Sequence, residues 1–99
     1  MSGRRLLPAI HPGTILREEL ASMNISGNAL ALALRVPATR INDILQGKRA
    51  ISADTALRLG RFFGHAPQFW MNLQSAYELE LASRSKGDEI ARDVKPTAA

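Results

Sequence analysis

The residues best suited to recognise another molecule lie together in segment 38–49 of this chain of 99 residues. Hydroxyl, guanidinium, amide and carboxylate groups follow one another there, on Thr39, Arg40, Asn42 and Asp43. Such groups hydrogen-bond with the edges of DNA bases, and the methyl group of Ala38 can touch thymine. Lys48 and Arg49 follow with the positive charge that binds phosphate. The segment therefore has the chemistry of a nucleic-acid contact.

Apolar spacing predicts that a short helix over residues 37–46 carries these side chains. Ile41 and Ile44 stand three residues apart and are expected to face inward, which leaves the polar groups outside. A preceding helix is predicted over residues 26–34, and a break that contains Pro37 separates the two. Two short helices joined so closely cross at a steep angle and form a helix-turn-helix.

In a helix-turn-helix the second helix meets the bases with its N-terminal end. Thr39 and Asn42 are our first choices for base contacts, and Arg40 is expected to reach a guanine or a nearby phosphate. Asp43 either accepts a hydrogen bond from cytosine or holds Arg40 or Lys48 in place, and we favour the second role. Phosphate contacts are predicted at the start of the first motif helix and just after the second, at Ser26, Asn28, Lys48 and Arg49.

The location of the chain's formal charge of +4 supports this interpretation. Six basic and two acidic residues lie between Arg35 and Arg61, and in the rest of the chain the two signs balance. A polyanion bound to the second motif helix would lie against this excess. The alternative is an ordinary helical hairpin with a solvated polar face, which spacing alone does not exclude.

The rest of the chain is predicted to support the motif with further helices, over residues 14–23 and 52–63. A last helix over residues 67–82 carries a stripe of aromatic and aliphatic side chains that exceeds the needs of a small core. We expect this stripe to form a dimer interface through Phe69, Trp70, Leu73, Tyr77 and Leu81. Ordinary core packing is the alternative, above all for the first two. Residues 1–10 are interpreted as a flexible arm and residues 83–99 as a disordered tail.

The composition argues against several classes of protein. The chain has no cysteine, which suits a reducing cytoplasm, and it has neither a signal peptide nor an apolar run of membrane-spanning length. His11 and His65 lie far apart beside turn residues, where capping or surface roles are expected. A phosphate-binding loop ending at Lys48 is excluded because Asn42 and Arg49 occupy positions that require glycine and a hydroxyl residue. We therefore expect that the protein is not an enzyme and that it has neither a cofactor site nor a metal site.

Three segments resemble the HigA antitoxins, also described as the virulence-associated VapI type, of the Cro/C1-type (XRE) helix-turn-helix family. They are HPGTILREEL, ALALALRVPATRINDILQGKRAISADTALRLGRFFG and PQFWMNLQSAYELE, and they lie within residues 11–82. The resemblance implies an all-α, lambda-repressor-like domain of five helices that binds a palindromic operator upstream of its own genes as a homodimer. It also implies a partner toxin similar to HigB, an mRNA-cleaving ribonuclease. A solitary transcriptional regulator without a toxin is the alternative.

The chain departs from the family's pattern at three positions. Arg35 stands at a turn position that is usually glycine, and it must accept a left-handed conformation or remodel the turn. Leu32 stands where lysine is frequent, and Ala38 stands where relatives often have arginine or a larger polar residue. These differences bear on the strength and sequence of the operator more than on the fold.

Overall fold

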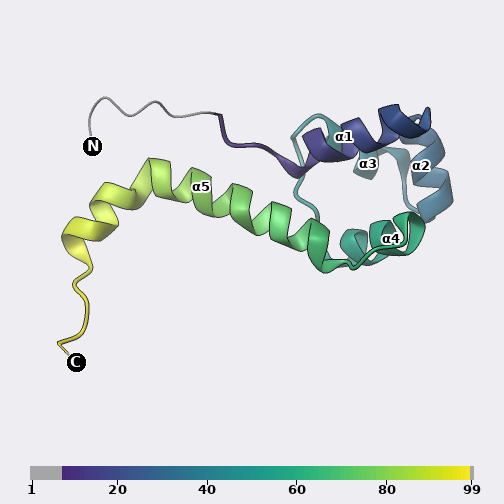
Figure 1. Cartoon of the computed structure of the whole chain (residues 1–99). Helices are drawn as coiled ribbons and strands as arrows, with labels where there is room; N and C mark the ends of the chain where they lie inside the picture. The colour runs from purple at the N-terminus through teal and green to yellow at the C-terminus, as the bar shows by residue number, and fades with distance from the viewer. Residues whose placement is uncertain (1–7, 99) are drawn as a thin grey trace.

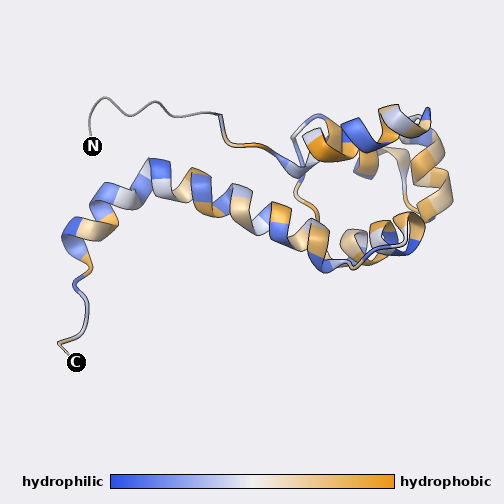
Figure 2. Cartoon of the chain, viewed as in Figure 1, coloured by the Kyte–Doolittle hydropathy of each residue, from blue (hydrophilic) through white to orange (hydrophobic). Residues whose placement is uncertain are grey.

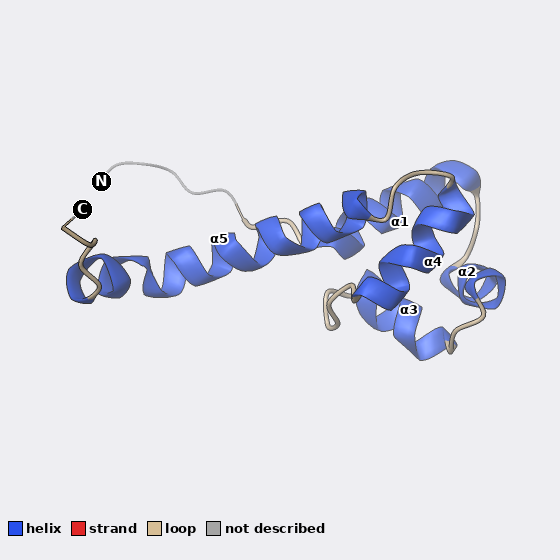
Figure 3. Cartoon of the chain, turned by 90° about the horizontal axis from the view of Figure 1, so that it is seen from below, coloured by secondary structure: helices blue, strands red, loops and turns tan. Residues whose placement is uncertain are grey.

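The computed structural model describes residues 8–98, and five helices make up most of this part (Figure 1). They are α1 (Pro12–Met23), α2 (Gly27–Leu34), α3 (Ala38–Leu45), α4 (Ala53–Phe63) and α5 (Gln68–Asp93). The described residues contain no strand (Figure 3), so the predicted all-α class and the five predicted helices are confirmed. Most of the arm predicted over residues 1–10 lies outside the described residues.

Serine side chains cap the starts of two of the helices. The Ser26 hydroxyl oxygen accepts a hydrogen bond from the Ala29 backbone nitrogen at 3.0 Å, at the start of α2. The Ser52 hydroxyl oxygen accepts one from the Thr55 backbone nitrogen at 3.2 Å, at the start of α4. Each bond satisfies a backbone donor that has no partner within the helix. The starts predicted for these helices, at residues 26 and 52, are confirmed to within one residue.

The turn between α2 and α3 contains a strained residue. Arg35 has φ 62° and ψ 44°, the left-handed conformation that was one of the two predicted alternatives. A residue with a Cβ atom pays roughly 1–2 kcal/mol for this conformation. Two backbone hydrogen bonds offset part of this cost. The Arg35 nitrogen donates to the Leu32 carbonyl oxygen at 3.2 Å, and the Val36 nitrogen donates to the Ala31 carbonyl oxygen at 3.1 Å. These bonds end α2 tightly, so that α3 follows after only a few residues.

One apolar core lies where the first four helices meet the beginning of α5, and Figure 2 shows apolar residues on these helices. Each helix contributes at least one completely buried large side chain: Leu16, Leu30, Ile41, Ile44, Leu59 and Trp70. Gly13 lets α1 approach α3 closely, because a Cβ atom there would collide with the Ile44 carbonyl oxygen. The inward face of α3 is thus fixed by packing, and its opposite face is left at the surface.

α5 is longer than predicted. It continues to Asp93, so the expected end near residue 82 and the disordered tail over residues 83–93 are wrong. The polar residues beyond 82 are exposed, but no proline occurs among them before Pro96, so each residue up to Asp93 keeps the backbone N–H that a helix requires. The ion pair from Arg84 Nε to Glu80 Oε2, at 2.7 Å and four residues apart, supports the extension. This part of α5 projects away from the other helices in Figure 1.

Trp70 lies in the core, and its predicted place in a dimer interface is wrong. Its side chain has no exposed surface. The indole meets the Phe69 ring edge-to-face with centroids 5.0 Å apart and lies 6.0 Å from the Phe63 ring. A side chain without accessible area cannot bury any against a second molecule, so the core-packing alternative holds for Trp70. The other four predicted interface residues keep part of their surface exposed: Phe69, Leu73, Tyr77 and Leu81.

Candidate nucleic-acid interface

α3 has one buried face and one accessible face. Ile41 and Ile44 have no exposed surface, as their spacing predicts. The five candidate base-contact residues all keep exposed surface: Ala38, Thr39, Arg40, Asn42 and Asp43. The first two of these lie at the N-terminal end of the helix and are exposed, so this end can enter a groove.

Two predicted contact residues are hydrogen-bonded to each other across the motif. Asn42 Nδ2 on α3 donates to Asn28 Oδ1 on α2 at 3.1 Å. Gly27 permits this close approach, because a Cβ atom there would lie 2.6 Å from Asn42 Oδ1 and 2.9 Å from Leu45 Cδ1. Each amide group has a second polar atom with which it can bind a ligand. The structure thus brings a predicted base contact and a predicted phosphate contact side by side.

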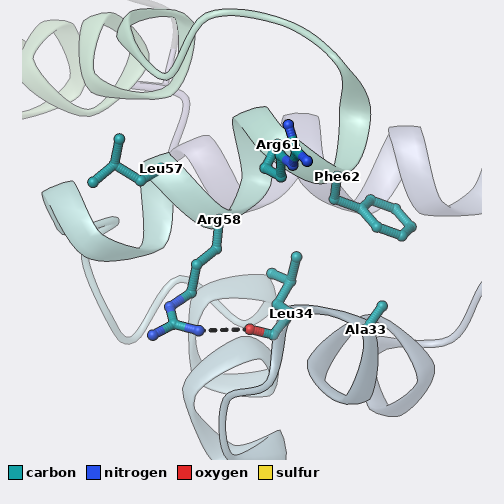
Figure 4. Close-up of a pocket in the computed structure, with 6 residues that line it drawn as sticks. All are labelled: Ala33, Leu34, Leu57, Arg58, Arg61 and Phe62. Carbon is teal, nitrogen blue, oxygen red and sulfur yellow. Dashed lines mark hydrogen bonds between the residues drawn. The ribbon is translucent and has the colours of Figure 1, made fainter.

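Arg40 is held by α4. Its Nη1 donates to Asp54 Oδ2 at 2.7 Å, and Arg58 Nε donates to the same oxygen at 2.9 Å. Arg58 Nη1 also donates to the Leu34 carbonyl oxygen at 2.8 Å, which is the dashed line in Figure 4. The hydrogen bonds from Arg58 and Arg40 hold the pKa of the Asp54 carboxyl below its usual value, so this group is ionised at neutral pH.

Asp43 pairs with a cation other than those predicted. Its Oδ2 lies 3.7 Å from Arg49 Nη2, while Arg40 turns to α4, so the predicted pairs with Arg40 and Lys48 are wrong. The reason is the turn after α3, where Gly47 has φ 76° and the Lys48 backbone nitrogen donates to the Asp43 carbonyl oxygen at 2.8 Å. This turn brings the side chain of Arg49 to the carboxylate.

The predicted phosphate contacts lie at two exposed places, the start of α2 and the loop after α3. They are Ser26, Asn28, Lys48 and Arg49. Because Asn28 contacts Asn42 and Arg49 contacts Asp43, both places flank the accessible face of α3. The Ser26 hydroxyl accepts its capping bond and can still donate its own proton to an anion. The arrangement can therefore hold a polyanionic backbone on either side of a base-reading helix.

His11 connects the start of α1 with the loop after α3 and with α5. Its Nδ1 accepts a hydrogen bond from the Gly13 backbone nitrogen at 2.9 Å, which confirms the capping role expected for this residue. Its ring meets the Tyr77 ring edge-to-face, with centroids 4.9 Å apart. Burial lowers the pKa of His11 below its usual value, although a hydrogen bond with the Arg49 backbone opposes this shift. The neutral ring fits the site, because a protonated Nδ1 could not accept the capping bond.

Sequence reasoning did not assign a role in the site to Gln74 or a partner to Asp54. Gln74 is buried, and its Oε1 accepts a hydrogen bond from the Ile51 backbone nitrogen at 2.8 Å, which ties α5 to the loop before α4. A polar residue within an apolar stripe was the available signal for Gln74. Asp54 pairs with Arg40, which lies 14 residues away, and nothing near Asp54 in the sequence indicates that partner.

Comparison with known proteins gives the family. A family model described as helix-turn-helix matches residues 16–69, more than half of the chain. Virulence-associated protein I of Dichelobacter nodosus is 54% identical, over 86% of this chain and 80% of its own length. The solved structure of an antidote protein of the HigA family from Coxiella burnetii is 48% identical with a TM-score of 0.90, over 92% of this chain and 100% of that one. The chain belongs to the HigA family of Cro/C1-type helix-turn-helix proteins.

A second structure extends this likeness to a DNA complex. The antitoxin HigA of Pseudomonas aeruginosa, solved with the higBA promoter, is 52% identical with a TM-score of 0.86, over 89% of this chain and 97% of that one. In the HigA-family chain described here, α2 and α3 are the two helices of the motif, and α3 holds the second position, that of the helix which enters the major groove in this motif. Its left-handed turn residue is Arg35, where the resemblance led us to expect glycine.

Proposed function

We propose that this HigA-family chain represses its own transcription by binding a specific operator, and that it is the antitoxin of a HigB-HigA-like toxin-antitoxin module. The observation that carries the proposal is the accessible face of α3, flanked on both sides by groups that suit phosphate. The similar HigA of Pseudomonas aeruginosa, which was solved with the higBA promoter, supports promoter DNA as the ligand.

The proposal divides the site into residues that read bases and residues that bind phosphate. Thr39 and Asn42 read base edges, Ala38 touches a thymine methyl group, and Arg40 reads a guanine. Asp43 acts at the edge of this set by holding Arg49, at 3.7 Å. The phosphate contacts give affinity for any DNA and make binding depend on salt. They come from Ser26, Asn28, Lys48 and Arg49.

We also propose that the chain acts as a homodimer on a palindromic site. Two-fold symmetry would present two recognition helices about 34 Å apart, one turn of DNA. The proposed interface lies on α5, where Phe69 and Leu81 are each 43% exposed. A hollow of about 330 Å³ runs beside α5, and its lining includes the apolar residues Ile10, Ile15 and Leu73. Apolar surface of this kind supports association with a second copy.

The proposed toxin partner is a HigB-like ribonuclease, and this chain itself has no catalytic step in the proposal. No three histidine, aspartate or glutamate side chains within residues 8–98 are placed to hold a metal ion. No helix in that part is long and apolar enough to cross a membrane. On this proposal the protein works in the cytoplasm and joins the nucleoid while it is bound to its operator.

The proposal is tested with a reporter driven by the region upstream of the chain's own gene. We expect the wild-type chain, supplied in trans, to lower reporter expression, and the K48A/R49A variant to relieve this repression. The same variant should still protect cells from a HigB-like ribonuclease encoded next to it, since its changes lie in the DNA interface. Repression without any protection would favour a solitary regulator. A reporter that does not respond to the wild-type chain would refute autorepression.

A further inference from the structure

Arg40 is the one predicted base contact whose charged group is bound to another helix. Its Nη1 donates to Asp54 Oδ2 at 2.7 Å, and its side chain is 31% exposed. The surrounding space would allow other conformations, because a hollow of about 310 Å³ lies beside Arg40 and is also lined by Arg49, Ser52 and Asp54. The hydrogen bond to Asp54, rather than steric confinement, therefore sets the direction of the guanidinium.

Asp54 is itself fixed from the opposite side. Arg58 Nε donates to the same carboxylate oxygen at 2.9 Å, and Arg58 Nη1 donates to the carbonyl oxygen of Leu34 at 2.8 Å. Leu34 is the buried last residue of α2, and Figure 4 shows Arg58 reaching it from α4. A continuous set of hydrogen bonds thus runs from the end of α2 through α4 to the recognition helix. The carboxylate is held in place before any DNA arrives.

The geometry leaves Arg40 able to read a base. A guanidinium has five N–H donors, and the bond to Asp54 uses Nη1. The edge formed by Nε and Nη2 can still donate two parallel hydrogen bonds, the arrangement in which arginine recognises guanine O6 and N7. An arginine without such a partner would bind any nearby phosphate equally well, because its charge attracts all of them.

We propose that Asp54 is a specificity-determining positioning residue, which directs the Arg40 guanidinium toward a base edge and away from the phosphates. This inference rests on the proposed function, in which Arg40 reads a base. The carboxylate also lies beside a polyanion-binding surface, so it lowers affinity for DNA of any sequence. Asp54 therefore lowers the affinity for DNA of any sequence and raises the discrimination between sequences.

The test compares D54N, R40A and the double variant R40A/D54N in binding to the operator and to a scrambled fragment of equal length. We expect D54N to lower the ratio of operator to scrambled affinity about tenfold, within the range that one good arginine–guanine contact supplies. Affinity for the scrambled fragment should rise, with a steeper salt dependence. In the R40A background, D54N should leave the ratio unchanged, because no guanidinium remains to be positioned.

Two further variants separate position from charge. D54E keeps the negative charge but moves the carboxylate outward by one methylene group, so it should also lower the ratio while scrambled affinity stays near the wild-type value. D93N removes the same charge from a pair with Arg92, 3.1 Å long, at the far end of α5, and should leave the ratio unchanged. Thermal unfolding of each variant confirms that the fold is kept.

The outcomes distinguish this inference from the proposed function. If R40A lowers the ratio and D54N does not, or if D54N lowers it equally in the R40A background, Asp54 does not position Arg40 and only the inference fails. If R40A itself leaves the ratio unchanged, base reading by Arg40 fails and the inference falls with it. A drop in the ratio for D54N and D54E that disappears in the R40A background supports the proposal.

Discussion

The motif region from α2 to α4 and the second half of α5 are both helical, but different interactions stabilise them. In the motif region, hydrogen bonds join different helices, as between Asn42 and Asn28 or between Arg58 and the Leu34 carbonyl. In the second half of α5, the ion pair between Arg84 and Glu80 spans one helical turn. The recognition surface is thus fixed within one chain. α5 also keeps apolar surface exposed at Phe69 and Leu81, and this is where we propose that a second copy binds.

Trp70 joins α5 to the core, and its truncation should lower the free energy of unfolding more than any other change predicted below. Trp70→Ala removes the largest completely buried side chain and should lower the free energy of unfolding by about 3–5 kcal/mol. Leu79→Ala, at a side chain that is 70% exposed on the same helix, should change it by less than about 0.5 kcal/mol. Chemical denaturation measures both. If both variants lost the same free energy of unfolding, the side chains at positions 70 and 79 would contribute equally to packing.

Trp70→Phe sharpens the same comparison. The indole Nε1 is buried without a hydrogen-bond partner among the described residues, so phenylalanine keeps most of the apolar contact and loses no hydrogen bond. The loss of unfolding free energy should be well below that of Trp70→Ala. A loss as large as that of alanine would indicate that the indole nitrogen has a partner.

Gln74 joins the first turns of α5 to the loop before α4, and its replacement should have the next largest effect. Gln74→Met keeps the side-chain length but leaves the Ile51 backbone nitrogen without its acceptor, at a cost of about 1–3 kcal/mol. Gln68→Met, at an exposed position where the amide donates to Asn72 Oδ1, is the matched control and should be nearly neutral. Thermal and chemical unfolding measure the difference, and equal stability of the two variants would contradict the structural role of Gln74.

Leu81 lies in the proposed dimer interface on α5, so its substitution tests that interface. Leu81→Asp places a charge on the expected interface and should weaken self-association by about tenfold or more, with unfolding of the isolated chain unchanged. Sedimentation equilibrium measures the association. If the variant associates as the wild-type chain does, the interface lies elsewhere. A wild-type chain that stays monomeric at high concentration would contradict the proposed homodimer.

Substitution of His11 should have the smallest effect of these changes, on the pH dependence of the free energy of unfolding. The direction of this pH dependence follows from the lowered pKa of His11. The unfolded chain binds a proton at His11 more readily than the folded chain, so stability is greatest above the ordinary pKa of 6.5. It should fall as the pH drops through 6.5 toward the lowered value and then level off. In His11→Asn the amide oxygen can cap α1 without titrating, so unfolding scans from pH 7.5 to 5.5 should show a flatter dependence. The same dependence in both proteins would assign it to another group.

The sequence predicted the parts of this molecule that depend on local pattern. The spacing of Ile41 and Ile44 identified the inward face of α3, and the helix starts predicted at residues 26 and 52 lie within one residue of those of α2 and α4. The pairs that position the site were not predictable in the same way, because Arg40 and Asp54 are 14 residues apart and Gln74 and Ile51 are 23 apart. Helical periodicity carries no information about which groups, far apart in the sequence, meet after the helices pack.

Two errors on α5 have related causes. A periodic apolar stripe looks the same whether it faces its own core or a second molecule, so the pattern alone could not place Trp70 inside. The far end was misjudged because polar residues without a core were interpreted as disorder, although polar residues with local pairs such as Arg84 with Glu80 also continue a helix. Contacts with the core therefore decide which residues of α5 are buried, whereas local pairs along the helix decide how far α5 extends.

The most direct test of the central idea, that α3 reads sequence while its flanks supply affinity, is DNA binding by two double variants. Binding of T39A/N42A and of K48A/R49A to the operator and to scrambled DNA is measured over a range of salt concentrations. We expect T39A/N42A to lose discrimination, by about 1–3 kcal/mol for each base contact, and to keep the salt dependence. K48A/R49A should bind both DNAs more weakly, with a salt slope flatter by about 2. If both variants weaken binding to every sequence equally, α3 is not the reading element.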